Sequence, residues 1–306
     1  MPCYNPLVAW RFEGKMVFNP PPNHLINKPF NLPCSKCIGC RFNYARSWAL
    51  RCQLEALSHK ENCFITLTFN NEELHKRQNA WSVDVKDFQL FMKKLRKDLK
   101  KPIRFFHCGE YGEKTYRPHY HALIFGHDFR IQSPINKVKK YGSDKYPLYE
   151  SSYLTSRWGR GHTTVGELNF DTASYTARYV TKKIKGDATN IHINPETGEV
   201  SKINDVYCTM SRANGIGYAA YQKYKHNWYP NDFIVNGNGI KMKPPRYFDQ
   251  LYENEFPDKF EKIKKLRKDN LDFVDQNPKD SNYKRLKDIE NVKLLNLTET
   301  LREIDA

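Results

Sequence analysis

The segment HYHALIF, residues 119–125, places two histidines one residue apart at the start of an apolar run. The run predicts a β-strand from Tyr120 to Phe125. Because side chains alternate along a strand, His119 and His121 project from one face and Tyr120 from the other. Two neighbouring imidazoles supply half of a divalent-metal site. The plain alternative is a surface histidine pair that binds nothing.

Segments near this strand alternate between strand-like and helix-like patterns. The runs CFITLTF (Cys63–Phe69) and IRFFHC (Ile103–Cys108) have strand character. Ser82–Lys100 places apolar residues at helical spacing, with Ser82 or Asp84 as the N-cap. Strands separated by a helix predict an α+β fold, with helices on one face of a sheet.

An acidic residue precedes the histidine strand at a position where it could complete the site. Glu110 follows the strand that ends at Cys108, and a turn-rich segment connects it to His119. If the two strands are neighbours, Glu110 completes a site of two histidines and one carboxylate, with open positions for a phosphate oxygen and water. Glu113 is the alternative ligand, and Glu110 would otherwise be an ordinary loop carboxylate.

A second group of polar residues falls in a helical segment, SYTARYVTKKI, residues 174–184. Residues four apart on a helix lie about 40° apart around its axis and roughly 6 Å along it, so Tyr175 and Tyr179 share a face. Lys182 falls on the same stripe. A phenol is a weak nucleophile at its ordinary pKa near 10, and a nearby cation and a metal-polarised phosphate would activate it. The alternative is a core helix with two half-buried tyrosines.

The chain has eight cysteines, and four of them lie within its first 40 residues. Cys34, Cys37 and Cys40 supply three thiols within one loop, and Cys3 is the best fourth ligand for a tetrahedral structural Zn²⁺, with Cys52 as a competitor. Free thiols and an iron–sulfur cluster are the alternatives. The remaining cysteines lie in or beside apolar runs and are expected to be small core residues: Cys63, Cys108 and Cys208.

The charge of the chain indicates the class of its partners. It contains 50 Lys and Arg against 34 Asp and Glu, a formal net charge of +16, and 14% aromatic residues. Such a surface suits polyanions, although a basic excess alone can be only solubilising. No apolar run reaches the roughly 18 residues of a membrane span, and no secretory signal is recognisable. These features predict a cytosolic protein without membrane contact.

The chain divides into three regions by composition and pattern. Residues 1–59 form an N-terminal arm that contains the cysteine cluster and a helix from Asn43 to about His59. Residues 60–235 hold the alternating strands and helices, and form the catalytic core. Residues 236–306 form a charged, partly helical C-terminal extension.

Three segments, taken in order, resemble a known family. CFITLTF, RPHYHALIF and YTARYVTKK resemble motifs I, II and III of the HUH endonucleases of rolling-circle replication. The further strings MPCYNP, LPCSKCIGCR, CGEYG and MSRANGIG make the chain similar to the replication initiators of gokushovirus-type microviruses. The resemblance covers most of residues 1–250. It implies a central antiparallel sheet flanked by helices, with the histidines on a central strand and the tyrosine helix packed over them.

The resemblance also implies a chemistry. His119, His121 and Glu110 would hold Mg²⁺ or Mn²⁺, one of Tyr175 and Tyr179 would attack a phosphodiester of single-stranded origin DNA, and Lys182 would follow them as the family's lysine. The products would be a 5′-phosphotyrosine and a free 3′-OH, and strand joining would follow. A basic channel would hold the DNA; its candidate residues are Lys93, Lys94, Arg96, Lys97, Arg117, Arg178 and Lys183.

The expected partners are origin DNA, single-stranded or melted, together with a host helicase and polymerase in the cytoplasm of a bacterial cell. A helicase is expected because the chain has no Walker-type phosphate loop. Two other functions remain open. One is a relaxase or transposase with the same chemistry, although relaxases usually place the tyrosine before the histidines. The other is a non-catalytic, zinc-containing DNA-binding protein.

Overall fold

The structure is a computed structural model. It describes residues 3–22, 29–112, 115–131, 136–138, 147–182, 191–193, 198, 200–275 and 283–305. The side chains of 136–138, 179–182, 271–275, 283–284 and 297–305 lie outside this description. The chain divides into two compact units, one of residues 1–44 with 266–303 and one of residues 45–265 with 304–306. In the described part of the chain, no helix is both long enough and apolar enough to cross a membrane.

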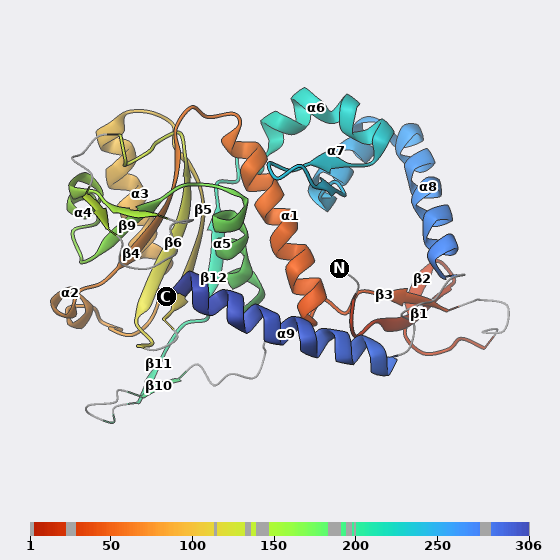
Figure 1. Ribbon diagram of the computed structural model, residues 1–306, viewed down its shortest axis with the longest axis horizontal. Coiled ribbons are helices and arrows are strands. Elements are labelled where there is room, and N and C mark those ends of the chain that lie inside the picture. The colour runs from red at the N-terminus through yellow and green to blue at the C-terminus, as the bar shows by residue number, and fades with distance from the viewer. Residues whose placement is uncertain are drawn as a thin grey trace. The chain divides into compact units, whose positions relative to one another are not determined.

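The larger unit is built on a seven-stranded antiparallel sheet (Figure 1). Its strand order is β12-β5-β6-β4-β9-β8-β7. The strands are β4 (Asn62–Thr68), β5 (Arg104–Tyr111), β6 (Pro118–Phe125), β7 (Asn136–Val138), β8 (Leu148–Glu150), β9 (Thr163–Gly166) and β12 (Tyr207–Met210). The histidine strand β6 therefore lies between β5 and β4, inside the sheet, where both of its edges are paired.

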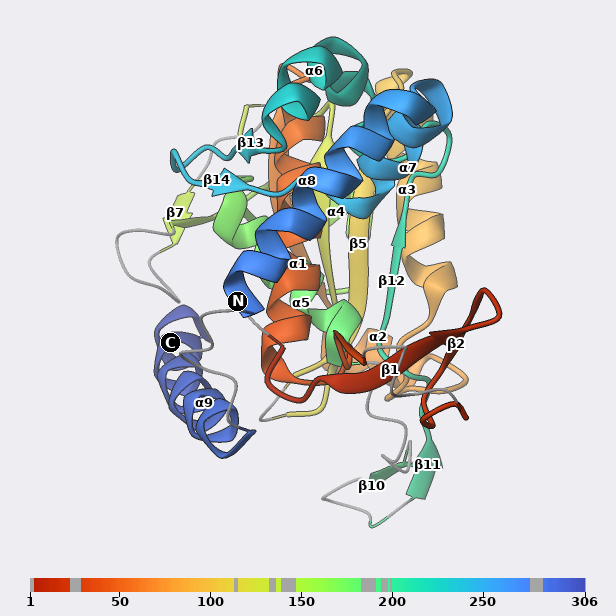
Figure 2. The same cartoon turned by 90° about the vertical axis from the view of Figure 1, so that its right-hand side faces the viewer.

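Helices cover both faces of the sheet, so the expectation of helices on one face is wrong. One face packs on α3 (Val85–Leu99) and α4 (Ser152–Trp158), and its core includes Tyr120. The other face packs on α1 (Ile38–Ala56) and α5 (Phe170–Lys182). Figure 2 shows α3 and α1 on opposite sides of β5. The central strands require this arrangement, because β4 and β6 have apolar side chains on both faces, and each face needs a cover.

Element boundaries differ from the sequence prediction in two informative places. Helix α3 begins after Asp84, whose side chain accepts a hydrogen bond from the Lys86 N–H, so one of the two predicted caps is confirmed. Strand β5 continues to Tyr111 because its pairing with β6 extends to the turn, and Glu110 therefore lies within the strand and not after it. Helix α1 begins at Ile38, so Cys40 lies in its first turn and not in a loop.

Three further helices complete the larger unit with an aromatic core of their own. The helices are α6 (Tyr218–Asn231), α7 (Arg246–Glu255) and the first part of α8 (Pro257–Asp275). The short helix α2 (Asn71–His75) follows β4 and lies apart from them (Figure 1). Tyr229 and Tyr252 stack with ring centroids 3.9 Å apart, and Phe248 and Phe260 pack around them. Two small antiparallel pairs also occur: β10 (Ile191–Ile193) with β11 (Val200–Lys202), and β13 (Ile234–Val235) with β14 (Lys241–Met242).

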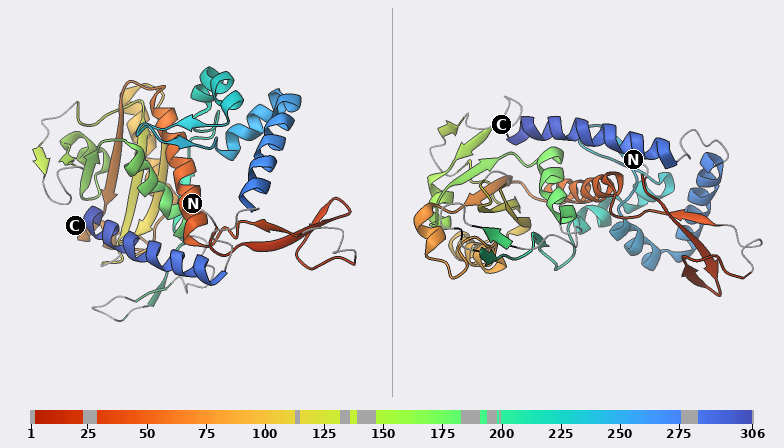
Figure 3. Two further views of the ribbon diagram at one scale, coloured as in Figure 1. Left: turned by 45° about the vertical axis from the view of Figure 1, so that its right-hand side comes forward. Right: turned by 90° about the horizontal axis from the view of Figure 1, so that it is seen from below.

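The smaller unit contains a three-stranded sheet and the C-terminal helix. Strand β1 (Leu7–Phe12) pairs antiparallel with β2 (Lys15–Val17) and β3 (Phe30–Leu32), and the β1–β2 hairpin is visible in Figure 3. Helix α9 (Tyr283–Asp305) contributes Leu286 to a small core with Tyr4, Cys37 and Ile38.

Candidate active site

The histidine strand and the acidic strand are neighbours, as the sequence analysis required. In the β5–β6 register, Glu110 lies opposite His119 and Cys108 lies opposite His121. The Nε2 atom of His121 is 2.7 Å from Oε1 of Glu110, and both side chains are buried. This distance allows one cation to take a ligand atom from each residue.

The third residue of the expected metal site lies somewhat apart. The ring centroids of His119 and His121 are 6.5 Å apart, with the rings nearly parallel. Among the described residues, the four N-terminal cysteines alone form a group of three or more whose ligand atoms all lie within 4.8 Å. His121 and Glu110 therefore fit a cation together, and the imidazole of His119 must rearrange to join them.

Hydrogen bonds orient both histidines through Nδ1. The Nδ1 atom of His121 lies 3.0 Å from the Thr66 hydroxyl, and Nδ1 of His119 lies 2.6 Å from the Arg117 carbonyl. A carbonyl only accepts, so Nδ1 of His119 carries the proton and Nε2 is its ligand atom, whereas the Thr66 hydroxyl can donate to or accept from His121. Burial lowers the pKa of His119, and the neighbouring His121 imidazole lowers it further, which keeps the ring neutral as a ligand requires.

A close backbone contact also positions His119. Gly112 lies beside its ring, and a Cβ on that glycine would be 2.9 Å from Cε1 of His119. Any larger residue at 112 would push the imidazole away. The sequence analysis did not identify Thr66 or Gly112 as site residues, because only the register of three strands shows that they touch the histidines.

Helix α5 brings its first tyrosine to the histidine strand. The Asn169 side chain accepts a hydrogen bond from the Thr172 N–H (2.9 Å) and caps the start of the helix. Ala173 and Ala177 are fully buried against the sheet, and their small side chains allow a close approach. Tyr175 consequently reaches His121, with ring centroids 5.3 Å apart and the rings edge to face.

Two more side chains surround Tyr175. Phe64 on β4 stacks on His121 with centroids 5.7 Å apart and meets Tyr175 edge to face at 6.3 Å. The Arg178 guanidinium lies 5.4 Å from the centroid of the Tyr175 ring. A cation so placed favours negative charge on a phenol or phosphate nearby. The site therefore combines a phenol, a guanidinium cation and an imidazole–carboxylate pair.

Some of the expected site residues lie outside the described residues. Tyr179 and Lys182 belong to α5, but their side chains are not described, and Glu113 and Lys183 are not described at all. Their roles stay predictions.

The basic residues expected to line a DNA channel do not all lie near the histidines. Arg117 and Arg178 belong to the site described above. Four of the others lie on α3, whose apolar stripe packs on the opposite face of the sheet, and their side chains are exposed there: Lys93, Lys94, Arg96 and Lys97. A channel at the histidines would not include these four residues.

The cysteine cluster of the smaller unit is assembled from two segments of the chain. The sulfur atoms of Cys3, Cys34, Cys37 and Cys40 all lie within 4.8 Å of one another. Burial of Cys37 opposes ionisation, but backbone N–H groups of Cys40 and Tyr4 point at its sulfur, and its pKa is lowered to about 7. Four thiols with one readily ionised fit the donor set of tetrahedral Zn²⁺.

The other cysteines do not compete for this group. Cys52 is fully buried in the core between α1 and the sheet, so the competing assignment of Cys52 is wrong. Cys63 and Cys108 are fully buried and Cys208 is half-buried, as expected for core residues.

Comparison with known proteins identifies the family. The chain is 32% identical over 270 residues to the replication-associated protein VP4 of Bdellovibrio phage phiMH2K, covering 85% of this chain and 80% of the relative. The chain belongs to the microvirus-type replication-associated proteins. It is also 33% identical to the replication-associated protein ORF2 of Spiroplasma virus 4, over 78% of this chain and 72% of the relative. A third relative, the replication-associated protein ORF4 of Chlamydia phage 1, is 31% identical over 72% of this chain and 53% of its own length.

The family model for the replication-associated proteins ORF2/G2P matches residues 62–184. The matched segment runs from the first residue of β4 to just beyond α5, so it contains Glu110, both histidines and both tyrosines. No solved structure matches the chain.

Proposed function

We propose that this protein initiates replication of a phage genome as an HUH endonuclease, nicking and rejoining single-stranded DNA through tyrosine attack. The observation that supports the proposal is the contact between Tyr175 and His121, beside Glu110. A nucleophile next to a group of cation ligands is the arrangement that phosphodiester transfer needs. The names of the relatives agree with a role in replication, which would take place inside the host cell.

The proposed reaction exchanges one phosphodiester for another. The Tyr175 phenol loses its proton, its oxygen forms a bond to phosphorus, and the bond from phosphorus to the 3′ oxygen breaks. The 3′ oxygen takes up a proton, so the products are a 5′-phosphotyrosine and a free 3′-OH. Because the phosphotyrosine conserves the ester, a later 3′-OH can attack it and rejoin the strand.

Each described residue has a physical role in this step. The Arg178 cation near the Tyr175 ring would favour the phenolate. Thr66 and the Arg117 carbonyl hold the two imidazoles in place through their Nδ1 atoms. Mg²⁺ or Mn²⁺ held by His121, Glu110 and a reoriented His119 would supply positive charge against the nonbridging phosphate oxygens.

Tyr179 would provide the second nucleophile. It follows Tyr175 by four residues on the same helix, and positions four apart lie on one side of α5. Alternating attack by two tyrosines would let one chain cut the regenerated origin while still attached to the first 5′ end. The free 3′-OH would prime a host polymerase, and a host helicase would open the duplex. Lys182 would act beside them as a cation.

We also propose that Cys3, Cys34, Cys37 and Cys40 bind one structural Zn²⁺. The convergence of four sulfur atoms from residues far apart in the sequence supports this proposal. The ion would link the N-terminal segment to the start of α1 and stabilise the smaller unit.

The experiment that tests the proposed function is covalent capture. The purified protein is incubated with Mn²⁺ and a labelled library of random single-stranded oligonucleotides, and denaturing gels reveal any protein–DNA adduct. We expect an adduct in the wild type and none in the double variant Tyr175→Phe, Tyr179→Phe. An adduct that persists in the double variant would show that the nucleophiles are wrong. DNA binding without any adduct would favour the non-catalytic, zinc-containing DNA-binding protein.

A further inference from the structure

A cavity of about 380 Å³ lies at the end of β4, next to the candidate active site. It is lined by Thr68, Phe69, Asn70, Asn71, Arg117 and His162, and we call it the Arg117 cavity. Small-molecule sites commonly have volumes of about 300–1,000 Å³, so the Arg117 cavity is large enough for part of a nucleotide.

The Arg117 cavity adjoins the histidines through two residues. Thr68 lies opposite His119 in the β4–β6 register. It follows Thr66 by two residues, and Thr66 contacts His121, so alternation places Thr68 on the histidine face as well. Arg117, whose carbonyl contacts His119, lines the cavity with its side chain. A strand bound at the histidines would therefore reach this cavity with its next nucleotide.

The Arg117 cavity has donor groups that the protein does not neutralise. Arg117 donates through Nη2 to the Asn71 side-chain oxygen (2.7 Å) and to the Phe69 carbonyl (3.3 Å), and its Nε is buried, so Nη1 is the donor left for a ligand. No described carboxylate forms a salt bridge with Arg117. His162 is exposed at the rim. An anion or a base with acceptor atoms would satisfy these donors.

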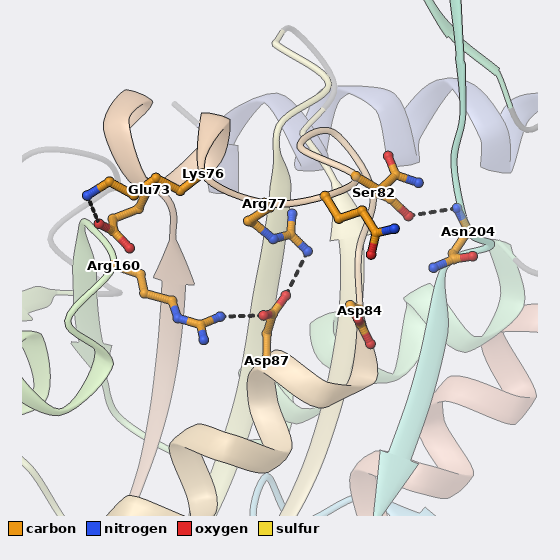
Figure 4. Close-up of a pocket in the computed structure, with 10 residues that line it drawn as sticks. Glu73, Lys76, Arg77, Ser82, Asp84, Asp87, Arg160 and Asn204 are labelled. Carbon is orange, nitrogen blue, oxygen red and sulfur yellow. Dashed lines mark hydrogen bonds and ion pairs between the residues drawn. The ribbon is translucent and has the colours of Figure 1, made fainter.

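In a second, larger cavity of the larger unit, the cations are paired with carboxylates. Figure 4 shows Arg77 and Arg160 pointing at Asp87 from two sides, and both form ion pairs with it. Lys76 in the same cavity pairs with Glu72 and Glu73. Its cations are already compensated, so the larger cavity is poorly suited to a nucleotide, whereas the Arg117 cavity retains its donors.

The wall of the Arg117 cavity is preformed in the structure without a ligand. Two backbone hydrogen bonds join the loop before β9 to the end of β4. The Thr68 N–H donates to the His162 carbonyl, and the Asn70 N–H donates to the Arg160 carbonyl, each at 2.9 Å. Gly161 makes this contact possible, since its φ is +146° and a Cβ there would lie 2.3 Å from the Asn70 nitrogen. These contacts fix His162 at the rim without a bound ligand.

We propose that the Arg117 cavity binds the base of the nucleotide next to the scissile phosphate in single-stranded DNA, and that Arg117 sets a base preference at that one position. The inference rests on the proposed nicking function. The planar guanidinium suits a base that offers two adjacent acceptors, such as guanine. The Asn70 and Asn71 side chains would add further polar contacts, and His162 would stack on the base or contact its sugar–phosphate.

The test uses the full chain and the covalent capture described above, followed by sequencing of the captured DNA. The variants are Arg117→Ala, Arg117→Lys and His162→Ala, with Arg157→Ala as a matched control because Arg157 pairs with Asp98 and does not line the cavity. We expect the wild type to prefer one base beside the cut site. Arg117→Ala should weaken that preference by about 5- to 100-fold at that position alone, and Arg117→Lys should not restore it.

The outcomes separate the two proposals. If the wild type forms no adduct, the proposed function fails and the cavity proposal fails with it. If the wild type forms adducts but Arg117→Ala keeps the same base preference, or loses adducts equally for all sequences, only the cavity proposal fails. A purely structural effect of Arg117 would lower total adduct without changing the preference, and Mn²⁺ affinity measured in each variant would report damage to the histidines.

Discussion

The phenol ring of Tyr175 on α5 meets the imidazole of His121 on β6 edge to face, with ring centroids 5.3 Å apart. These residues are 54 positions apart in the sequence (175 − 121). Their contact joins the helix of the two tyrosines to the strand of the two histidines. It therefore defines where a phosphate group would be attacked.

Tyr175→Phe separates the chemical role of the hydroxyl from the packing of the ring. Because the ring against His121 and Phe64 is kept, we expect the free energy of unfolding to change by less than about 1 kcal/mol. Loss of the nucleophile should leave adducts on Tyr179 alone and prevent the second transfer that closes a circle. Peptide mapping of the adduct by mass spectrometry tests this, and a wild-type adduct that never maps to residue 175 would contradict it.

Thr66→Val tests whether the hydroxyl orients His121 for a cation. The substitution keeps the branched shape in β4 but removes the 3.0 Å contact to Nδ1 of His121. Loss of such a supporting hydrogen bond should weaken Mn²⁺ binding by about 10- to 100-fold. Titration calorimetry measures the change. Thr164→Val, opposite Thr66 on β9, is the matched control and should bind Mn²⁺ as the wild type does.

Cys34→Ser should remove the metal of the N-terminal cluster. We expect about one zinc per chain in the wild type and a large loss in the variant, because each thiolate supplies one of four ligands. Elemental analysis of purified protein measures the zinc content. Cys52→Ala is the control, since Cys52 is buried in a different core, and it should keep its zinc. Equal zinc content in the two variants would refute the proposed site.

Glu55→Gln should make the larger unit less stable in a pH-dependent way. Glu55 is buried, accepts the Gly217 N–H (2.7 Å), contacts His59 and pairs with Arg104. Burial opposes its ionisation, but these partners outweigh burial and lower its pKa. A lowered carboxyl pKa contributes stability above the ordinary pKa of 4.5, and this stability is lost as the pH falls through the folded-state pKa.

The expected loss in Glu55→Gln is about 1–3 kcal/mol at pH 7. The difference from the wild type should shrink as the pH falls below the ordinary carboxyl pKa. Urea unfolding between about pH 2.5 and pH 7 would measure it, because the loss falls below the ordinary carboxyl pKa. A difference that stays constant with pH would mean that the carboxylate charge does not contribute.

Local patterns in the sequence determined which residues share a face. Alternation along a strand placed His119 and His121 together, and Tyr120 does point to the other side of the sheet, where its hydroxyl contacts Asp87. The apolar spacing of residues 82–100 predicted helix α3 with Ser82 or Asp84 as its cap, and the structure has Asp84. These features follow from the fixed periods of 2.0 and 3.6 residues, which any segment of sufficient length displays by itself.

Tertiary structure decided which faces meet. The register of β5 and β6 put Glu110 against His121, the packing of α5 put Tyr175 over the same ring, and the fold brought Cys3 to Cys34. It also placed α3 on the face opposite the histidines, against the expectation that its lysines line their channel. The repeat of a strand or helix determines only which side chains point the same way. Which residues they contact depends on packing between distant segments of the chain. No local pattern in the sequence encodes that packing.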